Sequence, residues 1–204
     1  VLPTKNVLFT VESTDPECFW LASYLESILV QVWYATTVCT QGRELKKLVA
    51  RYMKETGCDD AMKKGSYLFK LHDSGLRGVS SAEAAAVGGA AHLVNFPGTD
   101  TLPALVMMRE FYHADCAGCS MPTSDHATVA AWGEERELDS FKNMLERFPS
   151  GNVACVSDSY NVVNACEKYW GSDLKEAVEG RSGVLFVRPE GGELPRATLQ
   201  VLAE

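Results

Sequence analysis

The sequence lacks a long apolar run and an excess of basic charge. Its longest apolar candidate, SILVQVWYATTV, is broken by Gln31 and by Thr36 and Thr37, so no segment reaches the roughly 18 residues that a membrane-spanning helix needs. With 27 acidic and 19 basic residues the net charge is −8, which argues against a general nucleic-acid surface but allows local arginine sites for phosphate. Neither membranes nor nucleic acids are therefore expected partners.

The sequence also lacks an even number of cysteines. The seven cysteines are scattered, several of them in apolar segments, and this pattern indicates reduced thiols in a cytoplasmic setting instead of a disulfide framework. The 204 residues, 46% of them hydrophobic, are enough to form one substantial core. We therefore expect a globular cytoplasmic protein.

Short apolar segments that alternate with helical patterns predict a parallel β/α architecture. Strands are expected over residues 6–13, 67–72, 92–96, 153–157 and 184–188. Helices are expected to begin near Ser80, Thr101, Asp125 and Ser159. Thr14, Pro16 and Glu17 have the spacing of a capping box, which predicts a further helix start, and an amphipathic helix over 43–56 is expected to stop at Gly57.

Charged residues follow several of the expected strands. They are Asp73 and Arg77, then Asp100, Asp158 and Arg188. In β/α barrels and open α/β sheets the ligand lies at the carboxyl ends of the strands. A single aspartate there is often only a helix cap, but arginine does not cap helix N-termini, and its planar guanidinium suits carboxylate or phosphate. The pattern therefore predicts an anion site with acidic partners.

His126 lies in the segment MPTSDHATVAAWG, at an expected helix start. The positive end of the helix dipole disfavours the imidazolium form, and the backbone N–H groups there suit an anion. The residues alone leave two interpretations open. His126 is either a neutral nucleophile beside a phosphate or a residue of the capping region without chemistry.

Two further motifs carry less weight. HADCAGC (113–119) has the spacing of half a zinc site, but a structural zinc site needs four ligands and no second pair lies nearby in the sequence, so no metal ligands are expected. The glycine- and alanine-rich segment 78–92 lacks the Gly-Lys-Ser/Thr ending of a phosphate-binding loop. Its small residues are expected to allow close helix packing.

Several segments resemble the nicotinamide phosphoribosyltransferase family, in the same order along the chain. They are LHDSGLRGVSSAE (71–83), AHLVNFPGTDT (91–101), SDHATVAAWG (124–133), VSDSYNVVNACEKYWG (156–171) and VRPEGG (187–192), with VLFTVESTDPECFW (7–20) before them. The resemblance implies an α/β fold, a partial type II phosphoribosyltransferase. Residues 1–65 would supply a strand and helices of a companion domain, and residues 66–204 would form part of an incomplete β/α barrel, truncated at its C-terminal end because the family's glycine-rich phosphate loops lie beyond Glu204.

The resemblance also implies an activity in NAD salvage. The family transfers the phosphoribosyl group of phosphoribosyl diphosphate to nicotinamide, giving nicotinamide mononucleotide and diphosphate. Mg²⁺ accompanies the phosphoribosyl diphosphate, and ATP stimulates the reaction by phosphorylating a histidine. The family acts as a homodimer whose active sites are shared between the subunits.

Individual residues take roles from the resemblance. His126 matches the phosphorylated histidine, Asp158 the carboxylate that orients it, and Arg77 and Arg188 the contacts to phosphate and diphosphate. Ser120 lies where the family lines the tunnel that admits the base. Asp100 matches the residue that binds the nicotinamide amide, and physical chemistry agrees, because an ionised aspartate attracts an amide NH₂ and repels the carboxylate of nicotinic acid.

Two of the expected substrate-binding positions depart from the family pattern. Ser74 stands where the family has a phenylalanine that stacks on the pyridine ring, and Glu190 stands where the family has an aspartate. Two alternatives to the amide-using enzyme therefore stay open. One is a nicotinate phosphoribosyltransferase, which Asp100 opposes. The other is a catalytically weakened member of the family that acts as a binding or regulatory subunit.

Overall fold

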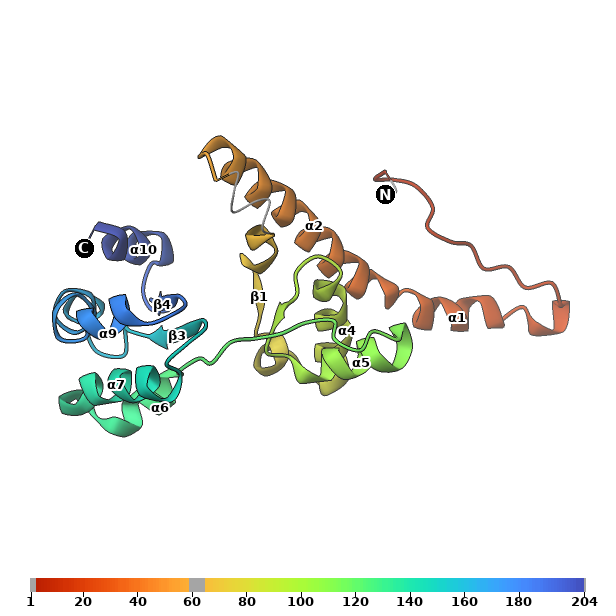
Figure 1. Cartoon of the computed structure of the whole chain (residues 1–204). Helices are drawn as coiled ribbons and strands as arrows, with labels where there is room; N and C mark the ends of the chain where they lie inside the picture. The colour runs from red at the N-terminus through yellow and green to blue at the C-terminus, as the bar shows by residue number, and fades with distance from the viewer. Residues whose placement is uncertain (1–2, 59–64, 204) are drawn as a thin grey trace. The chain divides into compact units, whose positions relative to one another are not determined.

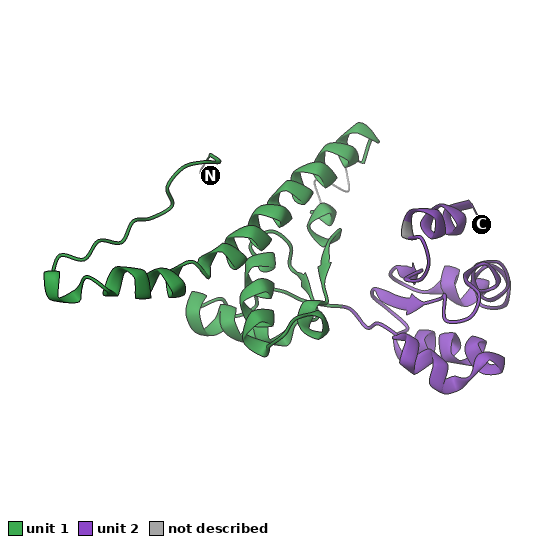
Figure 2. Ribbon diagram, turned by 180° about the vertical axis from the view of Figure 1, so that it is seen from behind, with its two compact units in different colours: residues 1–120 green, residues 121–204 purple. Residues whose placement is uncertain are grey.

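The computed structural model describes residues 3–58 and 65–203. The chain divides into two compact units, residues 1–120 and 121–204, shown in green and purple in Figure 2. Each unit is described by itself below. The domain division expected at residues 65 and 66 stays a prediction about the whole protein.

The N-terminal segment of unit 1 is extended and unpaired. The strand expected over 6–13 is wrong, because a strand needs a neighbour for its backbone groups and none of the described residues pairs with this segment. Its apolar side chains are exposed, Val7 by 72%. The first helical turn, η1 (Pro16–Cys18), is capped by Asp15, whose carboxylate accepts the Glu17 N–H, and not by Thr14 as the sequence predicted.

Two helices follow, α1 (Leu21–Leu29) and α2 (Val32–Glu55). The helix expected over 43–56 is confirmed but begins earlier, at Val32, and it ends as predicted before Gly57, which has a positive φ of 76°. α2 packs against α4 (Figure 1). There Lys46 Nζ donates to the Asn95 carbonyl at 2.9 Å, and Asn95 Nδ2 donates to the Cys39 carbonyl at 2.9 Å. Among the described helices even α2 is not apolar enough to cross a membrane.

The remainder of unit 1 alternates short strands and helices. It comprises η2 (Ser66–Phe69), β1 (His72–Asp73), η3 (Gly75–Gly78), α4 (Ala82–Leu93), β2 (Gly98–Thr99) and α5 (Leu102–Tyr112). β1 and β2 are parallel, with His72 opposite Gly98, and Cys119 forms a parallel bridge to Gly98 on the other side. Ser81 caps α4 and Thr101 precedes α5, so both expected helix starts are confirmed.

Two strands expected in this region are wrong. Residues 67–72 form most of η2 and only the first residue of β1, and residues 92–96 form the end of α4 and the turn that follows. A short apolar run has the same appearance in a strand and in a buried helix end, so the pattern does not separate them. The close packing expected of segment 78–92 is confirmed, because a Cβ on Gly89 would lie 2.5 Å from the Ala104 Cβ of α5.

Unit 2 repeats the alternation. It comprises α6 (His126–Trp132), η4 (Glu134–Arg136), α7 (Glu137–Arg147), β3 (Val153–Val156), α8 (Val162–Asn164), the π-helical η5 (Ala165–Asp173), α9 (Lys175–Gly180), β4 (Leu185–Arg188) and α10 (Leu194–Ala203). β3 and β4 are parallel and confirm the strands expected over 153–157 and 184–188. Asp125 caps α6 as predicted, whereas the helix expected near Ser159 begins at Val162, after its cap Asn161.

The core of unit 2 lies where β3 meets α7 and η5. Phe141 of α7 stacks on Trp170 of η5 with ring centroids 4.5 Å apart, and the indole N–H of Trp170 donates to Ser157 Oγ at 3.0 Å. Cys155 of β3 is fully buried in this core, and burial raises the pKa of its thiol to about 12. Both units therefore have parallel strands joined by helices, which confirms a mixed α/β protein that is mostly helical.

Candidate active site

Asp100 is the centre of a hydrogen-bonded group in unit 1, between β2 and α5. Ser120 Oγ donates to Asp100 Oδ1 at 2.5 Å, and Ser74 Oγ donates to Oδ2 at 3.2 Å. His72 Nε2 lies 3.0 Å from Oδ2. We call these four residues the Asp100 cluster. The structure thus brings together three of the predicted substrate-binding residues and adds a fourth.

The environment of Asp100 favours its ionised form. Partial burial raises the pKa of the carboxyl, but the hydrogen bonds from Ser120, His72 and Ser74 and the charge interaction with His72 outweigh burial, so the pKa falls below its ordinary value of 3.8. The side chain is still 48% exposed. Asp100 is therefore a fixed negative acceptor with one side open to a ligand.

His72 is the member of the cluster that the sequence interpretation missed. The apolar pattern over 67–72 predicts a strand that ends at His72 and indicates no role for the imidazole. The available signal is its position at the end of the strand expected over 67–72, directly before Asp73, which is the kind of position that identified Asp100. The pairing with Asp100 depends on the register of β1 and β2, which a single sequence does not determine.

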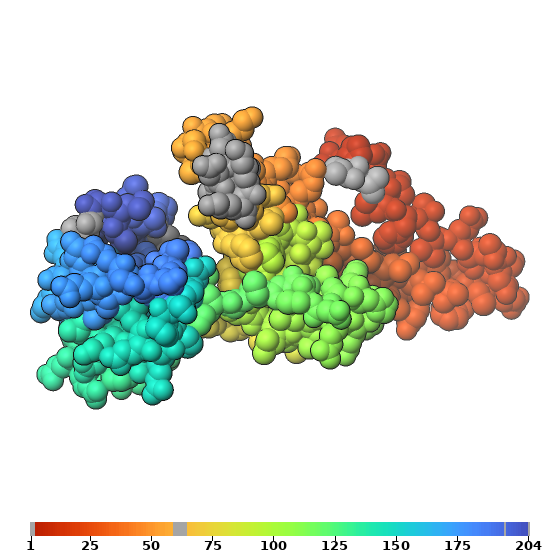
Figure 3. Space-filling model, viewed as in Figure 1, coloured from red at the N-terminus to blue at the C-terminus, as the bar shows by residue number. Residues whose placement is uncertain are grey.

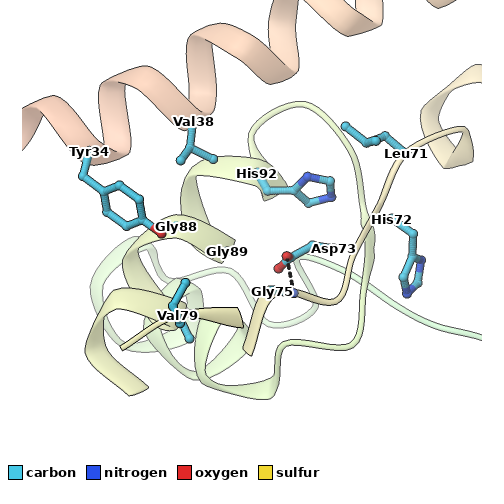
Figure 4. A pocket seen from close by; sticks show the side chains of 11 residues that line it. Tyr34, Val38, Leu71, His72, Asp73, Gly75, Val79, Gly88, Gly89 and His92 are labelled. Atoms are coloured by element: carbon cyan, nitrogen blue, oxygen red, sulfur yellow. Dashed lines mark hydrogen bonds between the residues drawn. The ribbon is translucent and has the colours of Figure 1, made fainter. Parts of the chain in front are cut away.

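A cavity of about 200 Å³ lies beside the cluster, between α2 and α4 (Figure 4). Tyr34 and Val38 of α2 line one side, and Gly88 and Gly89 of α4 line the other. A Cβ on Gly88 would lie 2.6 Å from Tyr34 Oη, so only glycine fits there without a shift. His92, at the end of the cavity, has a lowered pKa because it is buried, and its Nε2 lies 2.9 Å from the Gly98 carbonyl oxygen.

His126 is the centre of a second group, in unit 2. It is the first residue of α6, and its Nε2 lies 2.9 Å from Asp158 Oδ1. Because a carboxylate only accepts, this distance assigns the proton to Nε2. Asp158 is itself held by the backbone N–H groups of Glu190, at 2.7 Å, and Gly191, both donating to Oδ2. Its side chain is only 10% exposed, so it orients the imidazole firmly.

The other predicted residues of unit 2 join this second group, which we call the His126 cluster. Glu190 Oε2 lies 3.5 Å from His126 Nδ1, and Arg188, at the end of β4, donates through Nη2 to the Glu190 carboxylate. Arg77 lies in η3 of unit 1 and is exposed. The structure places these side chains, but their roles toward phosphate stay predictions.

The two clusters offer donors and acceptors for substrates but no ready-made metal site. In residues 3–58 and 65–203, no group of three or more His, Cys, Asp or Glu side chains gathers to hold a metal ion. Both oxygens of Asp158 and Oε1 of Glu190 already accept from protein donors. The seven cysteines all lie in the described ranges and none forms a disulfide.

In α/β proteins with parallel strands, ligands bind beyond the carboxyl ends of the strands, and Asp100, Asp158 and Arg188 lie at such ends. The chain belongs to the nicotinate phosphoribosyltransferase (NAPRTase) family, whose model matches residues 69–203. The match includes all eight predicted site residues.

Curated relatives narrow the comparison. Over 195 residues the chain is 48% identical to the nicotinamide phosphoribosyltransferase of Xanthomonas campestris pv. campestris (strain 8004). It is 33% identical to the nicotinamide phosphoribosyltransferase of Mycoplasma pneumoniae and 30% identical to that of Acinetobacter baylyi. These alignments cover 95%, 94% and 91% of this chain but only 41%, 40% and 38% of the relatives. The chain thus spans about two fifths of the length of the proteins that it matches.

Proposed function

We propose that the full-length protein transfers the phosphoribosyl group of phosphoribosyl diphosphate to nicotinamide, giving nicotinamide mononucleotide and diphosphate. The observation that carries the proposal is Asp100, an ionised carboxylate that three side chains hold in place and that is half exposed. The names of the three relatives support the same substrate.

Asp100 also separates the two substrates that the family comparisons suggest. The family model is named for nicotinate, whereas the relatives are named for nicotinamide. The amide of nicotinamide donates a hydrogen bond to an ionised carboxylate, but the carboxylate of nicotinic acid is repelled by it. A nicotinate phosphoribosyltransferase is therefore the second candidate, and Asp100 disfavours it.

The reaction needs positioning and charge neutralisation more than covalent help from the protein. The pyridine nitrogen forms a bond to C1 of the ribose while the bond from C1 to the diphosphate oxygen breaks. We assign Arg77 and Arg188 to the phosphate groups, because guanidinium groups neutralise the charge that develops on the leaving diphosphate. Mg²⁺ enters with the phosphoribosyl diphosphate as part of that substrate.

His126 is proposed to link the reaction to ATP. Its Nδ1 takes the γ-phosphoryl group of ATP, ADP leaves, and Asp158 holds the other ring nitrogen in its protonated state. We expect His126→Ala to abolish stimulation by ATP while slow basal synthesis persists. His113→Asn, which changes an exposed histidine, is the control and should keep the stimulation. Unchanged stimulation of the His126→Ala variant would exclude His126 from the coupling.

Ser74 and Glu190 raise the alternative of a member without catalysis, but the contacts of both residues favour an active site. Ser74 donates to Asp100, and Glu190 contacts both His126 and Arg188. Ser74 and Glu190, the two residues that depart from the family pattern, therefore each contact other members of a cluster. We further propose that the parallel segments of the two units are parts of an incomplete β/α barrel, and that the active protein is a cytoplasmic homodimer with shared sites.

Substitution of Asp100 tests the function. Asp100→Asn should narrow the preference for nicotinamide over nicotinic acid by about tenfold or more, because it removes the repulsion of the acid. The measurement is the ratio of kcat/KM for the two substrates, with formation of each mononucleotide followed by chromatography. Asp139→Asn, which alters an exposed carboxylate paired with Arg136, is the control. An unaltered ratio in Asp100→Asn would place the discrimination elsewhere.

A further inference from the structure

We propose that His72 is a positioning residue that sets the amide specificity of the site, by holding Asp100 in the orientation that receives the substrate amide. The proposal rests on the proposed function, since it needs Asp100 to bind nicotinamide. It assigns a role to an imidazole that lies in β1, opposite Gly98 of β2, and that was not among the predicted site residues.

The contact with Asp100 is direct. His72 Nε2 lies 3.0 Å from Asp100 Oδ2, and 34% of the His72 side chain is exposed. Because the carboxylate only accepts, Nε2 carries the proton in this pair. Ser120 holds the other oxygen, Oδ1. With one donor fixed on each oxygen, the carboxylate does not rotate freely about its own axis.

Ser74, the third donor to Asp100, constrains the carboxylate less than His72 does. Ser74 also reaches Oδ2, but at 3.2 Å its contact is longer than the 3.0 Å contact of His72 with the same oxygen, so Ser74 constrains that oxygen less. The imidazole of His72 presents its N–H at the edge of a rigid, planar ring. His72 therefore decides where Oδ2 lies, and Ser74 adapts to it.

Gly98 provides the space that the imidazole needs. The parallel register puts His72 opposite Gly98, and a Cβ at position 98 would lie 2.7 Å from His72 Nδ1. That distance is shorter than real Cβ contacts allow, so a side chain at 98 would displace the ring. The Gly98 backbone is fixed in turn by His92, whose Nε2 lies 2.9 Å from the Gly98 carbonyl oxygen. The ring position is therefore built from both strands.

The kinetic consequence follows from the chemistry. The amide group of nicotinamide does not react, so its contact with Asp100 has the same strength in the bound substrate and in the transition state. Loss of His72 should therefore raise KM and leave kcat nearly constant. A misoriented Asp100 also weakens the choice of amide over acid, because both the attraction and the repulsion depend on where the charge lies.

Three variants of His72 in the full-length protein make the test. His72→Leu removes the donor and should raise KM for nicotinamide about tenfold, with kcat within about twofold of the parent. His72→Gln carries an NH₂ close to the position of Nε2 and should recover most of the loss. His72→Asn has its NH₂ near the position of Nδ1, too short to reach Asp100, and should behave as His72→Leu.

A fourth variant leaves His72 in place. Gly98→Ala should raise KM as His72→Leu does, because its methyl group displaces the ring. Its matched control is Gly171→Ala in η5 of unit 2, where a Cβ would lie 2.9 Å from the Cys166 carbonyl oxygen, and it should lower the melting temperature without raising KM.

The outcomes separate this proposal from the proposed function. If the parent protein does not turn over nicotinamide, the proposed function fails and this inference fails with it. If the parent is active and KM of His72→Leu is unchanged, only the role of His72 is overturned. Equal losses in His72→Leu and His72→Gln, or a loss confined to kcat, would also overturn it, because a positioning donor predicts recovery by glutamine and an effect on KM.

Discussion

Glu137, the first residue of α7, carries a carboxyl group that is buried in unit 2. The residue is 2% exposed, and its Oε1 has no hydrogen-bond partner among the described residues. Burial, and to a lesser degree the charges of Glu134 and Asp158, raise the pKa of Glu137 from 4.5 to about 7. Between those two pH values the folded chain holds a proton on Glu137 that the unfolded chain has released. The free energy of unfolding therefore falls as the pH rises through this window, and above it the whole destabilisation by the buried charge is present.

We expect Glu137→Gln to stabilise the protein at pH 8, by on the order of 3 kcal/mol, because the amide carries no charge to bury. The gain should shrink as the pH falls from about 7 and should vanish below about 4.5. Thermal unfolding at several pH values measures it, with the exposed Glu135→Gln as the control. An equal gain at pH 4 and pH 8 would show that ionisation of Glu137 is not the cause.

At the residue scale, the sequence predicted what depends on near neighbours. The helix starts at Asp125 and Thr101 were predicted because a helix start depends on the few residues around it, and Asp125 caps α6 through its side chain. The pairing of His126 with Asp158 came from a family resemblance, and the structure brings the two side chains together. His72 was missed because its contact with Asp100 joins residues 28 positions apart and depends on strand register.

At the scale of elements, the backbones of the two loops that lead into β3 and β4 approach each other closely. Gly183 has a φ of 124°, and a Cβ there would lie 2.1 Å from the Gly151 carbonyl oxygen. The neighbouring Gly151 N–H donates to the Ser182 carbonyl at 2.7 Å, which fixes the two loops together. Only glycine satisfies both the dihedral angle and the contact.

Gly183→Ala should therefore destabilise the protein by roughly 2–4 kcal/mol, through backbone strain and loss of the loop contact. Gly180→Ala is the matched control, because a Cβ there meets no atom within 4 Å and alanine is a better helix former. Urea unfolding of the two variants measures the difference. Equal stability of Gly183→Ala and Gly180→Ala would contradict the contact.

Pairing and burial separate the predicted strands that are confirmed from the one at the N-terminus that is wrong. The segments 153–157 and 184–188 were correct because β3 has four buried residues and pairs with β4 over its whole length. The segment 6–13 has the same apolar composition, but no described residue pairs with it. Strand propensity describes a side chain that fits a pleated, half-buried surface, so it gives no strand where that surface is absent.

At the scale of the whole molecule, unit 1 exposes much apolar surface near its N-terminus. The red and orange residues in Figure 3 carry it, on the extended segment, α1 and the first turns of α2. The exposed side chains there include Val7, Leu8, Phe9, Phe19, Trp20, Tyr24, Ile28, Val30, Val32 and Trp33. Exposed apolar side chains in such number favour association with another surface.

A polypeptide of residues 1–204 alone is therefore expected to self-associate at micromolar concentration. Sedimentation velocity over a range of concentrations measures the effect. Replacing Phe19 and Trp20 by serine should shift the distribution toward monomer, whereas Leu199→Ser, at an exposed apolar position of α10, should change it less. A monomer at all concentrations would show that this surface does not drive association.

The buried thiol of Cys155 has a consequence for how opening of unit 2 can be followed. Alkylating reagents attack the thiolate, and a thiol with a pKa of about 12 is almost entirely protonated at pH 8. Cys58, Cys116 and Cys119 are exposed and lie in unit 1. A short pulse of iodoacetamide should therefore alkylate those three cysteines at once. Alkylation of Cys155 should be slower, and its rate should follow the separation of β3 from α7. Alkylation of Cys155 therefore reports the rate at which unit 2, which holds His126, opens.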